Sequence, residues 1–146
     1  MNLVFMGGTI RKRVYQDVKN IIMKKPLLVV VDVQNDFMNP TGSLYVKDAE
    51  NILEKISELI KFSEKEGYDI LYTSDCHYKD AKELSDNPDF INTFPTHCLR
   101  DTDGCKLVSE IKKDLLSIDW IVNYSVDDLK RIVNTTNEFL LLKDEF

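Results

Sequence analysis

Residues 27–32 read Leu-Leu-Val-Val-Val-Asp, a short apolar run that ends at a carboxylate. Runs this short and this rich in Val and Leu are typical of strands buried in a parallel sheet. Two later segments, 70–75 and 139–143, have the same form, and each also ends in a charged side chain. Because open α/β sheets place their sites just beyond the carboxyl ends of the strands, we expect three charged side chains to meet at one edge: Asp32, Asp75 and Lys143.

The segments between these strands carry the periodicity of helices. Apolar side chains at helical spacing predict a helix that lies on the sheet and ends near Gly67: Ile52, Leu53, Ile56, Leu59 and Ile60. The same spacing predicts helices over 104–116 and 126–133, and residues 120–122 are a candidate strand. Residues 75–103 show no such periodicity, and a loop of this length in a compact domain is usually functional.

Length, charge and cysteine content limit the classes of protein that fit. With 146 residues the chain has about the size of one domain, and residues 1–25 are predicted to be an N-terminal extension, helical from Arg11 to Met23. A net charge of -6 argues against a general nucleic-acid binder, and no apolar stretch approaches the ~20 residues that span a bilayer. Three cysteines without framework spacing predict a reduced, cytoplasmic protein.

Asp75 and His77 stand two positions apart at the end of a predicted strand, so their side chains face the same side. They can offer an oxygen and a nitrogen to one metal ion, with His97 returning from the long loop and Glu83 as a reachable fourth group. Two imidazoles with carboxylates suit Zn, Mn or Fe better than Ca or Mg. A solvated aspartate and two unrelated histidines are the alternative. A zinc finger that adds the neighbouring cysteines fits poorly, because adjacent residues on extended backbone point to opposite faces.

Asp32 and Lys143 carry a chemical prediction of their own. A carboxylate at the rim of a buried strand is partly desolvated, which raises its pKa and suits Asp32 to proton transfer. Lys143 could hold an anionic group or stabilise a developing charge. The alternatives are an aspartate that caps a helix and a lysine whose charge extends into solvent.

Four motifs together resemble a known family. The segment 27–37, LLVVVDVQNDF, resembles the opening strand of nicotinamidases and of the wider isochorismatase-like cysteine hydrolases. In order along the chain, TSDCH at 73–77, NPDFINTFPTHC at 87–98 and FLLLK at 139–143 are similar to that family's metal-binding, aromatic-Pro-x-His-Cys and lysine segments. The resemblance implies a three-layer, Rossmann-like α/β fold with a parallel sheet and helices on both faces. It covers 26–146, as the N-terminal part of such a domain, truncated just after the lysine strand.

The resemblance also implies roles for particular residues. In this family a cysteine attacks a carboxamide carbon and forms a thioester, so Asp32 would activate the thiol and Lys143 would assist. The metal would be a divalent ion, with zinc the first choice, that orients the substrate rather than generates the nucleophile. Its ligands, with Asp86 as the alternative to the glutamate, would be Asp75, His77, His97 and Glu83. Phe37 and Phe94 would hold the ring of a small amide substrate, above all nicotinamide.

One part of the family pattern is missing from this sequence. The family's nucleophilic cysteine follows the lysine on a later strand-to-helix turn, and none of Cys76, Cys98 or Cys105 stands in that position. We therefore expect the chain to be inactive alone and to lack the later strands that would flank the lysine strand. Two alternatives are a hydrolase of another amide or of an isochorismate-like ether, and a non-catalytic metal-binding remnant that acts as a homo-oligomer.

Overall fold

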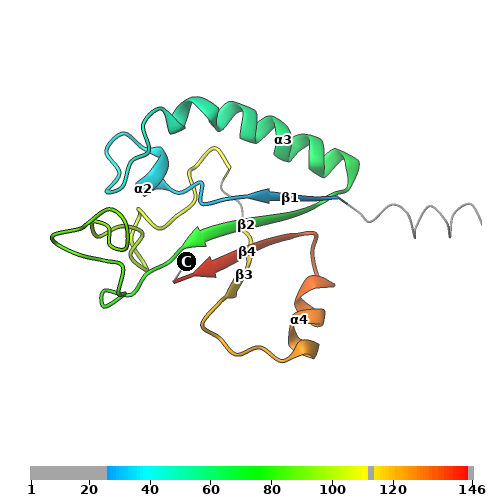
Figure 1. The fold of residues 1–146 in the computed structure, drawn as a ribbon. Helices are drawn as coiled ribbons and strands as arrows, with labels where there is room; N and C mark the ends of the chain where they lie inside the picture. Colours follow the sequence, from blue (N-terminus) through cyan, green and yellow to red (C-terminus); the bar gives the residue numbers. More distant parts are fainter. Residues whose placement is uncertain (1–25, 112–113, 145–146) are drawn as a thin grey trace, which may run out of the picture.

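The computed structural model describes residues 26–111 and 114–144, and the predicted N-terminal helix lies outside them. Within these residues the chain forms a parallel sheet of four strands in the order β1-β2-β4-β3 (Figure 1). The strands are β1 (Leu27–Val30), β2 (Asp69–Asp75), β3 (Leu116–Asp119) and β4 (Glu138–Lys143). The helices are α2 (Asn35–Met38), the 3-10 helix η1 (Ala49–Ile52), α3 (Leu53–Glu66) and α4 (Val126–Val133). The predicted α/β class with a parallel sheet is confirmed.

Helix α3 connects β1 to β2 and packs on the sheet through part of the predicted apolar stripe. Its inner face contributes Ile60, Leu53 and Ile56, whereas two predicted members of the stripe are exposed: Ile52 and Leu59. The helix ends where Gly67 adopts the left-handed conformation (φ 69°) and bonds back into the last turn through its N–H. None of the helices in the described ranges is both long enough and apolar enough to cross a bilayer.

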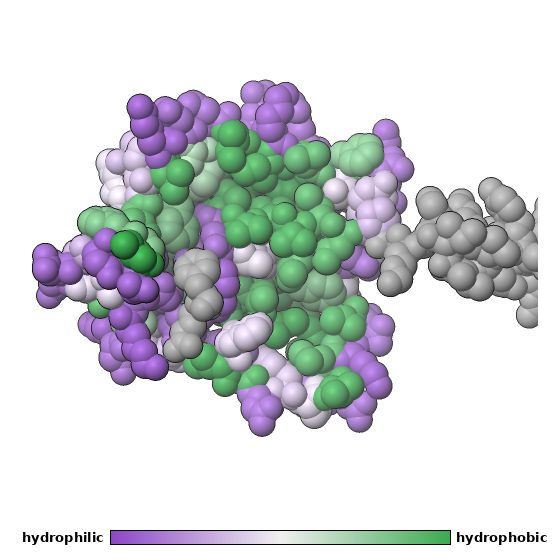
Figure 2. Space-filling view, in the orientation of Figure 1, coloured by the Kyte–Doolittle hydropathy of each residue, from purple (hydrophilic) through white to green (hydrophobic). Residues whose placement is uncertain are grey.

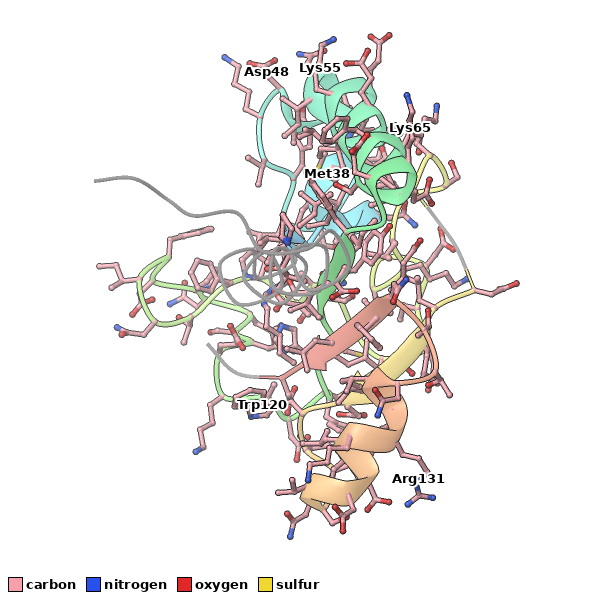
Figure 3. All side chains as sticks on the ribbon, turned by 90° about the vertical axis from the view of Figure 1, so that its right-hand side faces the viewer. Met38, Asp48, Lys55, Lys65, Trp120 and Arg131 are labelled. Carbon is pink, nitrogen blue, oxygen red and sulfur yellow. The ribbon has the colours of Figure 1, made fainter. Side chains whose placement is uncertain are left out.

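The two helical connections lie on opposite faces of the sheet. The crossovers from β1 to β2 through α3 and from β3 to β4 through α4 are both parallel, but they step in opposite directions across the strand order. Because such crossovers are right-handed, the opposite steps place α3 and α4 on opposite faces. Figure 1 shows α3 above the strands and α4 below them, and the turned view in Figure 3 agrees. The predicted three layers are therefore present.

The hydrophobic core lies between the sheet and α3. From the strands, Val30, Ile70 and Tyr72 are buried in it. Residues from a later irregular segment complete the same cluster: Leu107, Val108 and Ile111. This packing fixes β1 against β2, and with them the carboxyl ends of both strands.

The predicted helix over 104–116 is wrong for the described residues of this range, although three of its apolar side chains are buried in the core: Leu107, Val108 and Ile111. Residues 104–111 form turns, and several of their backbone groups bond to the segment that follows β1 instead of forming the regular hydrogen bonds of a helix. The Asn35 N–H donates to Lys106 O at 3.0 Å, and the Val108 N–H donates to Val33 O at 3.1 Å. Those bonds replace the helical ladder and tie the segment to the edge where the site lies.

The predicted strand at 120–122 is also wrong, because the strand lies just before it as β3. The Trp120 N–H still bonds to Leu142 O of β4 at 2.8 Å. The Val122 N–H then bonds back to Asp119 O at 3.1 Å, which closes a turn and takes the chain out of the sheet. Trp120 consequently stays exposed, as Figure 3 shows.

Strand β4, the predicted lysine strand, lies inside the sheet. It pairs with β2 over its whole length and with β3 on its other side. The expectation that later strands flank the lysine strand is wrong for the described sheet, since both neighbours of β4 precede it in the sequence. The edge strands of the described sheet are β1 and β3.

One face of the sheet leaves apolar side chains exposed. Leu27 and Val29 of β1, Val31 just after it and Leu116 of β3 all belong to this set. Figure 2 shows apolar surface gathered over the strands on the side toward the viewer. Contiguous apolar surface on a protein is typical of a face that another element or another molecule covers.

Candidate active site

The carboxyl ends of β1, β2 and β4 point to one edge of the sheet, on the left in Figure 1. Asp75 and Lys143 are register partners across β2 and β4, so the sheet itself sets them side by side. The Lys143 Nζ donates to Asp75 Oδ1 and lies 3.0 Å from Asp32 Oδ2. The structure thus brings together the three charged residues that the strand ends predicted.

Asp32 has an uncommon backbone conformation just beyond β1. Its φ is 50°, in the left-handed region that aspartate tolerates better than most residues. Thr73 on the neighbouring strand holds it from two directions. The Thr73 hydroxyl donates to Asp32 Oδ1 at 2.6 Å, and the Asp32 N–H donates to Thr73 O at 3.2 Å. One carboxylate oxygen of Asp32 is therefore fixed by Thr73, and the other faces Lys143.

Lys143 is the cation of this group. Burial lowers the pKa of Lys143, but its hydrogen bonds to Asp75 and Asp32 outweigh burial, and the pKa lies above its usual value. The side chains of Lys143 and Asp32 are each 15% exposed, and that of Asp75 is 2% exposed. A lysine that stays charged between two carboxylates offsets their mutual repulsion in a poorly hydrated place.

Asp75, His77 and His97 form a buried group of the kind that binds metals, and we call these three residues the metal-ligand trio. Asp75 Oδ2 lies 3.9 Å from the Nε2 atom of each histidine. Around a zinc ion with bonds of about 2.1 Å, tetrahedral ligands lie roughly 3.4 Å apart, so small shifts would let all three bind one ion. Asp75 Oδ2 and His77 Nε2 are buried without a hydrogen-bond partner. Because such atoms are nearly always paired, a bound cation fits this site.

The outer nitrogens of both imidazoles are held by carbonyl groups. His97 Nδ1 lies 2.8 Å from Pro95 O, and His77 Nδ1 lies 3.1 Å from Asp144 O. Since a carbonyl oxygen only accepts, each Nδ1 carries the hydrogen in this arrangement, and each Nε2 presents a lone pair to the centre. Histidines that bind metals are oriented in this way. The sequence analysis did not single out Asp144.

Glu83, the predicted fourth ligand, lies at the border of this group rather than within it. Its Oε1 is 3.5 Å from His77 Nδ1, the ring nitrogen that faces away from the trio. Burial raises the pKa of the Glu83 carboxyl, and the negative charge of Asp75 adds to this rise. The neighbouring His77 has the opposite effect and lowers the pKa in part. Asp86, the alternative ligand, is exposed.

This placement predicts different results for the two carboxylates. Glu83→Gln should weaken zinc binding about 10-fold or more, because groups that contact a ligating histidine commonly contribute that much. Asp86→Asn removes the same charge from an exposed position and should leave the affinity unchanged. Competition with a chromophoric chelator would measure both affinities. Equal effects, or a larger one from Asp86→Asn, would contradict the placement.

Gln34 is a site residue that the sequence analysis missed. Its side chain is fully buried and clamps the backbone of Asp75, since its Oε1 accepts from Asp75 N at 2.7 Å and its Nε2 donates to Asp75 O at 2.8 Å. The same Nε2 reaches Cys105 O at 2.8 Å. Gln34 therefore links β1, the end of β2 and the segment after the long loop.

Asp36, also missed, anchors the loop that carries His97. Its Oδ2 accepts from the Cys98 N–H at 2.7 Å, and its Oδ1 accepts from the Ser43 N–H at 3.1 Å. Gly104 packs against this carboxylate so closely that a Cβ there would overlap it. Only the polarity of the DVQND stretch hinted at such roles, and their partners are backbone groups that no sequence pattern reveals.

The two predicted substrate-binding aromatics both lie close to His97. The Phe37 ring centre lies 5.5 Å from that of His97, and the Phe94 ring centre lies 6.3 Å from it, edge-on. Both phenylalanines are half-buried. They form an aromatic border on the loop side of the metal-ligand trio.

The three thiols of the chain differ in environment. Cys98 is fully buried, and burial, with the nearby charge of Asp36, raises the pKa of its thiol well above the usual range. Its Sγ lies 3.9 Å from Gly104 O. Cys76 and Cys105 instead contact each other, with their Sγ atoms 3.3 Å apart.

The fold and the site together define an α/β protein whose reactive groups lie at the carboxyl ends of a parallel sheet. The profile of the isochorismatase domain family matches residues 26–130. The match covers more than half of the chain, and the chain therefore belongs to this family.

Two curated relatives are amidases of nicotinamide type. The chain is 30% identical over 111 residues to a nicotinamidase of Saccharomyces cerevisiae, a match that covers 62% of this chain and 51% of the relative. It is 32% identical over 77 residues to a nicotinamidase/pyrazinamidase of Mycobacterium tuberculosis, covering 53% of this chain and 40% of the relative. The chain thus spans about half the length, or less, of these relatives.

Solved structures show the same fold. The pyrazinamidase of Pyrococcus horikoshii, solved in complex with zinc, superposes with a TM-score of 0.56 at 22% identity, covering 84% of this chain and 54% of that one. The yeast nicotinamidase bound to nicotinaldehyde gives a TM-score of 0.51 at 25% identity, covering 82% of this chain and 57% of that one.

Proposed function

We propose that this chain carries the metal-binding and proton-transfer groups of an amidohydrolase that converts nicotinamide, or a related aromatic carboxamide, to the acid and ammonia. One observation carries the proposal: Lys143 contacts both Asp32 and Asp75, and so joins an acid–base pair to the metal-ligand trio. The relatives named as nicotinamidases support this class of substrate.

Asp32 is the proposed general base. Its Oδ1 is fixed by Thr73, which leaves Oδ2 and the adjacent ammonium of Lys143 as the pair that exchanges a proton with an attacking thiol. The charge on Lys143 would then stabilise the anion that develops on the substrate. A divalent ion held by Asp75, His77 and His97 would supply an electrophilic contact that orients the substrate.

The substrate ring is proposed to lie against the aromatic border. The rings of Phe37 and Phe94 each lie close to the ring of His97, so a planar substrate ring there would contact apolar faces while a ring atom reaches the metal-ligand trio. Such a border favours an aromatic carboxamide over an aliphatic one.

We further propose that none of the three thiols is the nucleophile. The thiol of Cys98 is buried with a raised pKa, which disfavours the reactive thiolate. Cys76 and Cys105 instead contact each other, and the Cys105 Sγ also donates to the backbone carbonyl of Asp75 at 3.3 Å.

An assay of ammonia release tests the statement about the nucleophile, and a binding measurement tests the proposed substrate. The chain loaded with zinc and supplied with nicotinamide should release no more ammonia than a buffer blank. Nicotinamide should nevertheless bind, as seen by saturation-transfer NMR, and Phe37→Ala should weaken the signal. Turnover that Cys98→Ser abolishes would overturn the statement about the nucleophile, and absence of binding would overturn the proposed substrate.

A further inference from the structure

We propose that Cys76 and Cys105 form a disulfide-forming site that reacts with hydroperoxides. Their Sγ atoms lie 3.3 Å apart, and both cysteines are free thiols. A disulfide bond is about 2.05 Å long, so the sulfurs need to approach by only about 1.2 Å. The two residues are 29 positions apart in sequence, so it is the fold that places their sulfurs in contact.

Both residues are held in place by their backbones. The Cys76 N–H donates to Lys143 O at 2.8 Å. The Cys105 carbonyl accepts from Gln34 Nε2 at 2.8 Å and from Ser74 Oγ at 3.2 Å. These bonds hold the backbones of both cysteines near each other. Held in this way, the two sulfurs react with each other more readily than with a molecule from solvent.

Cys76 lies between two members of the metal-ligand trio, yet its sulfur points away from them. On extended backbone, neighbouring side chains alternate between faces, so Asp75 and His77 face the trio while Cys76 faces Cys105. The Cys105 Sγ contacts the backbone carbonyl of Asp75 at 3.3 Å and not its carboxylate. The proposal does not rest on the proposed function.

The reaction balances with one hydroperoxide. One sulfur of the pair attacks the peroxide, the O–O bond breaks, and water or an alcohol leaves, so that this cysteine becomes a sulfenic acid. The sulfur of the other cysteine then attacks the oxidised sulfur, the S–O bond breaks, and water leaves with the thiol proton. Two thiols are oxidised to a disulfide and the peroxide is reduced.

Thiol titration with peptide mapping would test this. Treatment of the folded chain with hydrogen peroxide should lower the number of titratable thiols from three to one, and dithiothreitol should restore all three. Mapping without reduction should find the Cys76–Cys105 link. Cys98→Ser should still form it, and Cys105→Ser should not.

The same oxidation in denaturant is a matched control. In an unfolded chain the shorter loop closes more readily, so a link between Cys98 and Cys105, seven positions apart, should be favoured. A Cys76–Cys105 link that forms only in the folded chain supports the proposal. Native links that include Cys98, links between chains, or three thiols that persist after peroxide treatment would each overturn it.

Discussion

The His97→Ala variant should lose stoichiometric zinc binding, with a dissociation constant that rises more than about 100-fold, beyond the 10- to 100-fold typical of residues that merely support a ligand. The reason is that Asp75, His77 and His97 bring three ligand atoms within 4.8 Å of one another. Removal of one imidazole leaves two ligands, too few to hold a transition metal against water. Elemental analysis after dialysis and a chelator competition would measure the loss.

The amino-acid composition makes the zinc-binding test simple to interpret. It contains two histidines, and both belong to the trio, so no other imidazole binds zinc in the background. Asp103→Asn, which changes an exposed carboxylate, is a suitable control. Circular dichroism would verify that each variant is folded. If His97→Ala binds zinc as tightly as the unchanged chain, the trio is not the metal site.

Lys143→Met should lower the free energy of unfolding by about 3–5 kcal/mol at neutral pH, as expected when one partner of a buried ion pair is removed. The variant leaves the carboxylates of Asp32 and Asp75 close together without their cation. Urea denaturation in the presence of a chelator would measure the change without a contribution from bound metal.

Lys55→Met provides the control for this measurement. Lys55 pairs with Glu58 on the outside of α3, where their side chains are 71% and 56% exposed, and Figure 3 shows Lys55 at the solvent side of that helix. An exposed pair contributes at most about 1 kcal/mol. Equal losses from the two variants would mean that the Lys143 ion pairs do not stabilise the fold more than a surface pair does.

The Lys143 ammonium also predicts how the stability of the unchanged chain depends on pH. The pKa of Lys143 is raised in the folded state, because its hydrogen bonds to Asp75 and Asp32 outweigh burial. A raised folded pKa means that this contribution to stability is fully present below the unfolded value of about 10.4. It is lost as the pH rises through the folded pKa. Stability should therefore fall at strongly alkaline pH in the unchanged chain, and this fall should be smaller in Lys143→Met.

The sequence predicted the parts of the fold that depend on local pattern. Apolar runs identified β1, β2 and β4, and helical spacing identified α3 and α4. The errors at 104–116 and 120–122 have one cause. Both were predicted from their apolar residues alone, whereas the Asn35 N–H bonds to Lys106 O in the first segment and the Val122 N–H closes a turn onto Asp119 O in the second. Tertiary pairing of this kind leaves no periodicity in the sequence.

Some residues of the candidate site could also be predicted from local sequence patterns, and others could not. Asp32, Asp75 and Lys143 could be placed because parallel strands share an edge. The roles of Gln34 and Asp36 could not, because each acts on the backbone of a residue at least 41 positions away. The position of Glu83 also depends on how the long loop turns, which no spacing rule supplies.

For an ion held by Asp75, His77 and His97, the Asp36 anchor would slow exchange with solvent. Asp75 and His77 lie on or next to a strand that is paired on both sides, whereas His97 comes from a loop whose following residue is bound by the Asp36 carboxylate. His97 would therefore be the ligand whose movement most readily releases the ion. Asp36 would then lengthen the residence time of the ion without contacting it.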